Sequence, residues 1–267
     1  MKKAIRKIKY YHVVLTIVII CILLPIALIT IWSFTGRWPW PAMLPESYSL
    51  RTLKELFNGV HPLPALLGGS ILLASVSSLI STAVGVMTAR ALELYEFKGK
   101  SLIRFGYMLP VIVPATVLTM GLQIVFLKMG IADTAAGVII IHVMVSMPYC
   151  TTIMSDVIRA CGIKYEEQAS VLGAGPLKAF TEVSLPLITP GILSSLSMGF
   201  ILSYSQYFTT LIIGGGRVNT LSLVLVPYIQ SGDRPLMSIY SLVFVISALI
   251  IFFILEQLLK LSRKETA

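Results

Sequence analysis

Small and polar side chains recur on one face of the apolar segment 187–213. They are Ser195, Gly199, Ser203, Gln206 and Thr210, spaced four, four, three and four residues apart, which is helical spacing. Their hydroxyl and amide groups could bind a polar solute, or they could simply hydrogen-bond neighbouring helices. The residues that we expect to line a path for a solute are Gln123, His142, Ser203, Gln206 and Tyr207. For His142 the competing interpretation is a satisfied packing residue, because a lone histidine on an apolar helix usually has that role.

Groups that could perform catalysis are not assembled in the sequence. A phosphate-binding Gly-x-x-x-x-Gly-Lys-Ser/Thr loop is missing, and the glycine-rich stretch 214–217 lacks the required lysine and hydroxyl pair. The three histidines and three cysteines are scattered, with neither zinc-ligand spacing nor a Cys-x-x-Cys pair. We therefore predict that this chain is not an enzyme by itself and has no metal site or cofactor of its own.

The composition is that of an integral membrane protein. Hydrophobic residues make up 56% and charged residues 12% of the 267 residues, and the mean hydropathy is +0.88. A net charge of +9 could indicate nucleic-acid binding in a soluble protein, but basic loops beside a membrane explain it equally well. We expect an all-α protein that contacts membrane lipid and has no nucleic-acid partner.

Six apolar segments are long enough to cross a bilayer, which takes about 20 residues. They are Val13–Phe34, Leu63–Leu92, Ile103–Leu127, Ile131–Met154, Leu187–Ile213 and Leu236–Leu259. The first is too long for a cleaved signal peptide, so we predict an uncleaved transmembrane helix. Residues 1–62 would hold that helix and an external loop with a short surface helix near 53–57, and residues 63–267 would form a core of five helices. Prolines 110, 114 and 148 predict kinks in the third and fourth segments.

Basic residues set the orientation of the six predicted helices. With the N-terminus inside, fifteen lysines and arginines fall on the inner side and six on the outer side. The positive-inside rule therefore places both termini in the cytoplasm. It also places the loop between the fourth and fifth helices, residues 157–186, in the cytoplasm.

That loop has the pattern of two short helices joined by a turn. Tyr165, Ala169 and Leu172 recur at helical spacing, with Glu166 and Glu167 predicted on the other side of the helix. Gly173 lies where a left-handed cap would end the helix. A turn at 175–176 would follow, and its proline would occupy the first position of a second helix. Such a rigid protrusion could transmit a push.

The same residues carry a family resemblance. The order Glu-x-Ala-x-x-x-Gly, nine residues, then Val-x-Leu-Pro resembles the cytoplasmic loop of permease subunits of binding-protein-dependent ABC importers. The matching positions are Glu167, Ala169, Gly173, Leu185 and Pro186, whereas Gln168 replaces an alanine of the family pattern and Val183 an isoleucine. A weaker match joins a basic stretch at 97–100 to Leu109-Pro110 and Pro114. Together the two matches cover about residues 66–208.

The resemblance implies the permease subunit of a type I importer in a bacterial plasma membrane, forming half of a translocation pathway. It implies three kinds of protein partner: a dimer of ABC ATPases that binds ATP and Mg, a second permease subunit, and an extracytoplasmic solute-binding protein. It also implies that the 163–186 loop docks on an ATPase. The residues expected to couple the two are Glu166, Glu167, Ala169, Leu172, Gly173, Leu185 and Pro186.

Two other classes of membrane protein fit the sequence less well. A self-sufficient secondary transporter would normally carry a carboxylate inside the membrane, whereas the acids nearest the predicted helices lie at helix ends. An intramembrane enzyme lacks its catalytic groups. Within the importer family the resemblance extends to polyamine, ferric-ion, thiamine and oxyanion branches. Ser203-Tyr204-Ser205-Gln206-Tyr207 contains no acid, which favours a small polar organic solute or complexed ion over a free polyamine.

Overall fold

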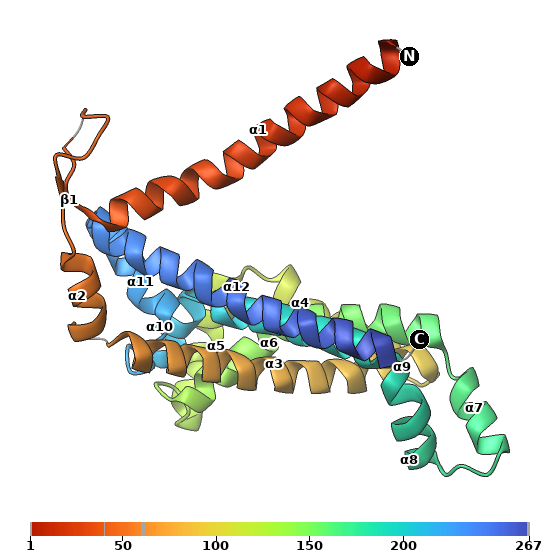
Figure 1. Cartoon of the computed structure of the whole chain (residues 1–267). Helices are drawn as coiled ribbons and strands as arrows, with labels where there is room; N and C mark the ends of the chain where they lie inside the picture. Colours follow the sequence, from red (N-terminus) through yellow and green to blue (C-terminus); the bar gives the residue numbers. More distant parts are fainter. Residues whose placement is uncertain (1, 40, 60–61, 266–267) are drawn as a thin grey trace. The chain divides into compact units, whose positions relative to one another are not determined.

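The computed structural model describes residues 2–39, 41–59 and 62–265, and most of them are helical (Figure 1). The chain divides into two compact units, one of Met1–Ala65 with Val224–Ile246 and one of Leu66–Leu223 with Ser247–Ala267. The expected boundary between residues 62 and 63 lies close to this division. The compact units differ from the expected division in one respect: Val224–Ile246 belongs with the N-terminal part.

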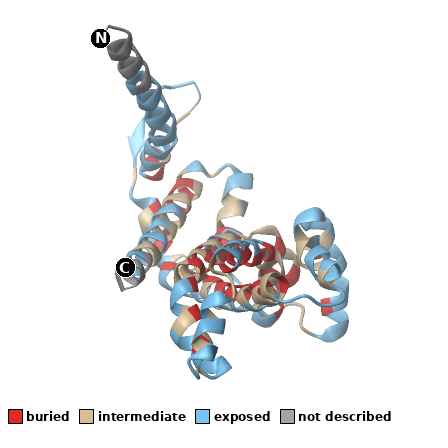
Figure 2. Cartoon of the chain, turned by 90° about the vertical axis from the view of Figure 1, so that its right-hand side faces the viewer, coloured by how far each residue is buried: buried red, intermediate tan, exposed pale blue. Residues whose placement is uncertain are grey.

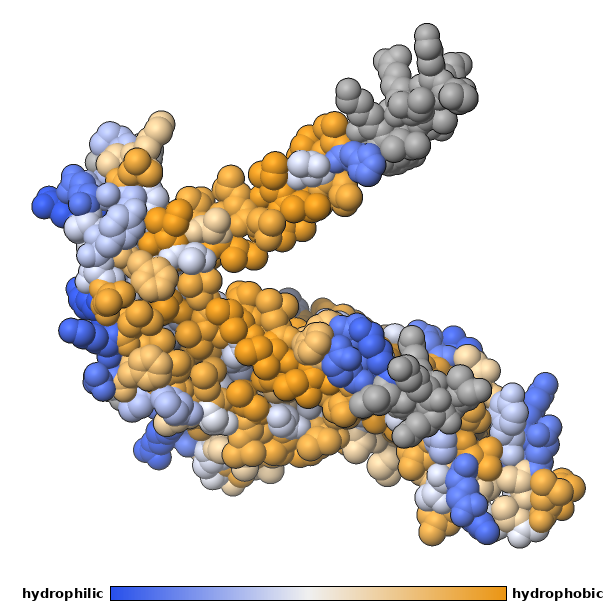
Figure 3. Space-filling view, viewed as in Figure 1, coloured by the Kyte–Doolittle hydropathy of each residue, from blue (hydrophilic) through white to orange (hydrophobic). Residues whose placement is uncertain are grey.

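The N-terminal part of the first unit contains a long helix, a two-stranded sheet and a short helix. Its elements are α1 (Lys2–Ser33), the antiparallel strands β1 (Thr35–Arg37) and β2 (Ser47–Tyr48), and α2 (Arg51–Asn58). The most apolar 18-residue stretch within residues 12–33 of α1 has a mean hydropathy of 3.1, and none of its residues is buried inside the chain. Figures 2 and 3 show this helix as exposed and almost uniformly hydrophobic. A helix such as α1, which is apolar all round, needs lipid or protein around it. Helix α2 confirms the short surface helix predicted near residues 53–57.

The second unit carries the helices that pack on one another. In chain order they are α3 (Leu63–Leu94), α4 (Lys100–Ile112), α5 (Ala115–Met129), α6 (Ala135–Cys161), α7 (Lys164–Val171), α8 (Pro176–Ala179), the π-helical turn η1 (Phe180–Ser184), α9 (Leu185–Tyr204) and α10 (Phe208–Gly214). Helices α11 (Leu221–Ser231) and α12 (Arg234–Glu265) each contribute to both units. Buried residues gather among the packed helices in Figure 2.

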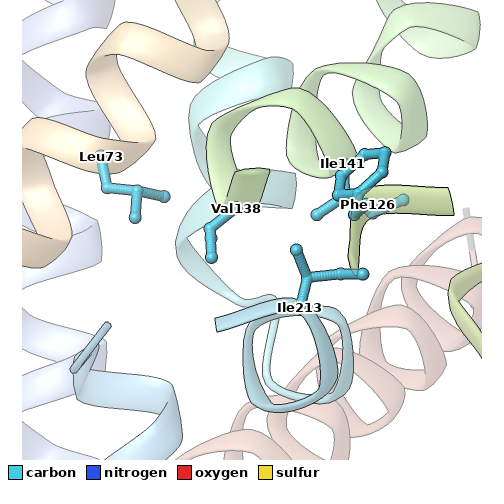
Figure 4. Close-up of a cluster of buried hydrophobic side chains, with 5 residues drawn as sticks. All are labelled: Leu73, Phe126, Val138, Ile141 and Ile213. Carbon is cyan, nitrogen blue, oxygen red and sulfur yellow. The ribbon is translucent and has the colours of Figure 1, made fainter. Parts of the chain in front are cut away.

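Helix α6 lies at the centre of the second unit. Its Val138 and Ile141 are fully buried against Leu73 of α3, Phe126 of α5 and Ile213 of α10 (Figure 4). Farther along α6, Met154 and Ile158 pack with Ala89 of α3 and Ile188 of α9. These two clusters fix α3 and α9 on α6 through close van der Waals contacts, which are small individually and large in sum.

Small residues allow the three central helices to approach closely. A Cβ on Gly85 of α3 would lie 3.1 Å from Cys150 of α6, and one on Gly199 of α9 would lie 3.1 Å from the Ser81 hydroxyl. The Cys150 thiol also lies 3.5 Å from the Ser195 carbonyl oxygen. Such close approach matters because van der Waals packing replaces the hydrophobic effect between helices in lipid.

Two of the six predicted transmembrane segments differ from single straight helices. In the described part of the chain, five helices are long and apolar enough to cross a membrane, and the third predicted segment is a pair, α4 and α5, bent by 107°. Pro114 precedes α5, as the prediction of a kink required, because proline removes a backbone donor and disfavours a helical residue before it. In the fifth predicted segment, 187–213, helix α9 ends at Tyr204. The polar residues of that segment therefore do not lie on one continuous helix. Helix α11 was not predicted.

Candidate functional site

The loop between α6 and α9 folds as the predicted helix pair. Helix α6 runs to Cys161 and α9 begins at Leu185, so the connection is shorter than the expected 157–186. Gly173 has φ +91° and follows α7, its N–H donating to the Ser170 carbonyl and that of Ala174 to Ala169, both at 3.0 Å. These two hydrogen bonds form a Schellman cap, which needs the left-handed conformation that glycine adopts without steric cost. Pro176 is the first residue of α8, also as predicted.

Helices α7 and α8 form a protrusion (Figure 1), and its surface shows hydrophobic and hydrophilic residues side by side (Figure 3). Val171 and Leu172 are each 87% exposed and Leu177 of α8 is 76% exposed. A hollow of about 550 Å³ lies on α7 between Lys164, Glu167, Gln168, Val171 and Leu172. Leucines so exposed on a short helix are costly in water, so this surface is suited to contact another protein.

Glu166, which the helical spacing grouped with Glu167 across α7 from Tyr165, Ala169 and Leu172, packs inward in the structure. Its carboxylate accepts two hydrogen bonds from the Arg90 guanidinium, Nη1 to Oε1 at 2.7 Å and Nη2 to Oε2 at 3.1 Å, and a third from the Ser184 hydroxyl. The Arg90 bonds hold the pKa of the Glu166 carboxyl below its usual range. The face of α7 that packs inward is thus that of Glu166 and Ala169, whereas Tyr165 and Leu172 are exposed. Helical spacing groups residues by face but does not show which face packs on the protein, and here the contact with Arg90 decides it.

The remaining predicted residues of the loop differ in their exposure to solvent. Glu167 is exposed beside the hollow on α7, Leu185 is half-buried at the start of α9, and Pro186 is exposed. Arg90 and Ser184 were not among the predicted site residues. They lie 76 and 18 positions from Glu166, so no local spacing pattern connects them.

The predicted path residues gather at the break between α9 and α10. His142 of α6 is fully buried, with Nδ1 2.8 Å from the Ser203 hydroxyl and Nε2 3.0 Å from that of Thr210. Thr210 donates its hydrogen to the Gln206 carbonyl at 2.9 Å, so it accepts from Nε2–H, and Nδ1 of the neutral ring accepts from Ser203. His142 therefore pins both sides of the break, in agreement with its interpretation as a satisfied packing residue.

Gln206 and Tyr207 lie in the break itself and are half-exposed. The Gln206 carbonyl also accepts from the Ser222 hydroxyl at 2.8 Å, and Gln123 of α5 donates to the Ile212 carbonyl of α10 at 3.2 Å. Broken helix is tolerated at membrane depth where polar side chains satisfy the freed backbone groups, as they do here. Among the residues that the structure describes, no cluster of His, Cys, Asp or Glu could hold a metal ion.

Comparison with known proteins gives one family and several relatives. The family described as binding-protein-dependent transport system inner membrane component matches residues 81–266. A sulfate transport system permease protein of Salmonella typhimurium is 25% identical over 204 residues, covering 71% of this chain and 74% of the relative. A molybdate/tungstate transport system permease protein of Pyrococcus abyssi is 32% identical over 147 residues, covering 55% and 59%. A spermidine/putrescine transport system permease protein of Haemophilus influenzae is 23% identical over 214 residues, covering 80% and 82%.

Solved structures agree on the fold. A chain of a bacterial ABC transporter involved in the import of the acidic polysaccharide alginate superposes with a TM-score of 0.72 over 97% of this chain and 96% of the other, at 16% identity. A second structure of an alginate ABC transporter, in complex with a periplasmic protein that binds an alginate pentasaccharide, gives 0.63 over 92% and 91%. At this identity the likeness concerns the fold alone.

Proposed function

The chain belongs to the family of binding-protein-dependent transport system inner membrane components and is a permease subunit of an ABC importer, and we propose that its α7–α8 protrusion is the surface through which a separate ATPase drives it. The observation that supports this role is the exposure of Val171, Leu172 and Leu177 beside Glu167 on a helix pair joined through the Gly173 cap. An apolar ridge flanked by charge fits a groove of complementary shape on a partner, because burial of the leucines supplies affinity and the charge supplies orientation.

The assembly that we propose contains two permease subunits, of which this chain is one, two ATPases, and an extracytoplasmic solute-binding protein. Five long apolar helices and one bent pair make half of a pathway, so a second copy or a different permease would complete it. The protrusion and both termini would face the cytoplasm, where the fifteen basic residues of the inner segments fall. ATP and Mg would be bound by the ATPases, and this chain would hydrolyse none.

Alternating access would follow from movement of the protrusion. Closure of the ATPases would displace α7 and α8, and the helices of the two permeases would then rock between inward-facing and outward-facing states. The break between α9 and α10, with Gln206 and Tyr207 half-exposed in it, is our candidate for the part of the path that contacts the solute.

The solute that we propose is a small polar organic molecule or a complexed ion, and not a free polyamine. The path residues at the break offer hydroxyl, amide and aromatic groups and no carboxylate, whereas a bare polycation would favour nearby acids. Binding measurements on the cognate solute-binding protein test this directly. Nanomolar capture of putrescine or spermidine would contradict it.

Retention of the ATPase by affinity-purified membrane complexes tests the docking surface. Leu172→Glu places a charge on an 87% exposed leucine of α7, and Leu44→Glu makes the same change on a 77% exposed leucine of the segment between β1 and β2. Losing the burial of one leucine costs roughly 1.5–3 kcal/mol, so we expect Leu172→Glu to weaken ATPase retention by more than about tenfold and Leu44→Glu to leave it unchanged. Equal retention by the two variants would contradict the docking surface, and ATP hydrolysis by the isolated, contaminant-free chain would contradict the division of labour.

A further inference from the structure

The carboxylate of Glu166 is the meeting point of three elements that are far apart in the sequence. Arg90 belongs to α3, Glu166 to α7 and Ser184 to the π-helical turn that leads into α9. The Arg90–Glu166 pair is bidentate, and the two side chains are only 19% and 15% exposed. The Arg90 guanidinium also lies over the ring of Phe180, 4.6 Å from its centroid, at the other end of the same turn. A charged pair with this geometry and this burial is far less screened than a surface pair.

The covalent connections of α7, by contrast, pass through glycine at both ends. Gly162, with φ +67°, precedes the helix, and Gly173, with φ +91°, follows it, before a further glycine at 175. A Cβ on any of the three would meet nothing within 4 Å, the two hydrogen bonds of the Gly173 cap end on α7 itself, and the Gly162 N–H bonds to Ile158 of α6, so neither cap bonds α7 to α6 or α9. A displacement of α7 would bend such joints before it moved α6 or α9. The side-chain contact at Glu166 therefore offers the stiffer route.

That route leads into the packed core. Ala89, the neighbour of Arg90, is fully buried with Met154 of α6 and Ile188 of α9. Arg90 thus stands on a part of α3 that is fixed to the central helices, and Ser184 stands one residue before α9 begins. Force applied at Glu166 would reach α3 and α9 together.

We propose that Arg90, Glu166 and Ser184 form the transmission contact through which movement of α7 is converted into movement of α3 and α9. The three are positioning residues: they would contact neither the solute nor ATP. This inference rests on the proposed function, because it assumes that an ATPase moves α7. It assigns Glu166 to transmission within the chain and leaves the exposed Glu167 for contact with the ATPase.

A matched ion pair in the same unit provides the control. Glu93 of α3 accepts two hydrogen bonds from Arg159 of α6, at 3.0 and 3.1 Å, and one from Arg104 of α4 at 3.3 Å. Glu93 lies four positions after Ala89 on α3, and within the described part of the chain its cluster makes no hydrogen bond or ion pair with α7. Glu93→Gln therefore removes a comparable charge without touching the transmission contact.

The test measures solute uptake and ATP hydrolysis in the same reconstituted complexes, with the amount of bound ATPase determined in parallel. For Glu166→Gln we expect normal ATPase retention and hydrolysis, but about tenfold less uptake per ATP hydrolysed, within the 5–150-fold range typical of coupling between sites. The exchanged pair Arg90→Glu with Glu166→Arg should recover most of the ratio, and Glu93→Gln should keep it. An unchanged ratio in Glu166→Gln, or loss of ATPase retention with a normal ratio in the complexes that remain, would overturn the proposal.

A second measurement does not depend on how the variants fold. Spin labels on the exposed Ser170 of α7 and Met87 of α3 should keep their separation to within about 2 Å between nucleotide-free and ATP-bound complexes, while both move relative to the ATPase. A change approaching one helical turn, about 5 Å, would overturn the proposal. If wild-type uptake needs no ATP, the proposed function fails first. If it needs ATP and Glu166→Gln couples normally, only the transmission contact is refuted.

Discussion

Replacing Gly173 by valine should uncouple the importer while the protein still inserts in the membrane. Gly173 has φ +91°, and the cap that it forms directs the chain from α7 into α8. A Cβ there would meet nothing within 4 Å, so the substitution creates no clash and acts only through the backbone. The perturbation is therefore confined to the geometry of the protrusion.

The magnitude follows from the backbone conformation. A residue with a Cβ in the left-handed region costs about 1–2 kcal/mol, and a β-branched residue lies at the upper end of that range. The loop can avoid the cost by abandoning the cap, which would give up the bonds from Gly173 and Ala174 at 3.0 Å each. A penalty of 1–2 kcal/mol changes a two-state population by a factor of about 5–30. We expect the apparent affinity of the ATPase for the permease to fall by that factor, with uptake falling at least as much.

The assay compares uptake and ATPase binding for Gly173→Val, Gly173→Asn and Gly99→Val at equal amounts of inserted protein. Asparagine tolerates the left-handed region and should recover most of the activity. Gly99 has the same φ of +91°, again with nothing within 4 Å of a Cβ, but it lies before α4 and outside the protrusion. The reasoning is refuted if Gly173→Val transports normally, or if Gly99→Val loses as much ATPase affinity as Gly173→Val.

Three further predictions concern single side chains. Glu167→Lys should weaken ATPase binding, measured by retention on purified complexes, because it reverses the charge beside the hollow on α7; Glu182→Lys on the neighbouring turn is the matched control, and equal effects would remove Glu167 from the interface. His142→Leu should lower the free energy of unfolding by about 1–3 kcal/mol, since it leaves the buried Ser203 hydroxyl without the ring nitrogen that it bonds, and thermal unfolding in detergent that matches wild type would contradict this. Because the folded pKa of Glu166 is lowered, its contribution to stability is present above the usual glutamate pKa of about 4.3 and is lost as the pH falls through the folded value. Thermal unfolding should therefore be less pH-dependent on the acid side in Glu166→Gln than in wild type, and identical pH profiles would count against the ion pair.

Local chemistry explains what the sequence could predict. Gly173 and Pro176 are residues whose own backbone preferences end one helix and begin the next, so the helix pair was predictable without knowledge of its surroundings. The bend before α5 was predictable for the same reason, from Pro114. The long apolar segments were predictable because lipid imposes a minimum length on every membrane-crossing helix.

Contacts between distant residues explain what it could not predict. The end of α9 at Tyr204 contains neither proline nor glycine, and the break is held by hydroxyls and a histidine up to 68 positions away. Helical spacing could not show that Glu166 packs inward, because its partner, Arg90, is 76 positions away. Helical periodicity shows which residues share a face of a helix, but it does not show which face packs on the protein. On a protrusion, apolar residues can face outward, where we propose that a partner protein covers them.

Uptake by sealed vesicles tests the central claim most directly. The vesicles would contain this chain with its permease and ATPase partners, with ATP inside and the loaded solute-binding protein outside. If this chain is the permease half of an ATP-driven importer, labelled solute accumulates only when both ATP and the binding protein are present, and dissipating ion gradients leaves the rate unchanged. Accumulation without ATP that collapses with the ion gradient would contradict the account and favour a self-sufficient secondary transporter.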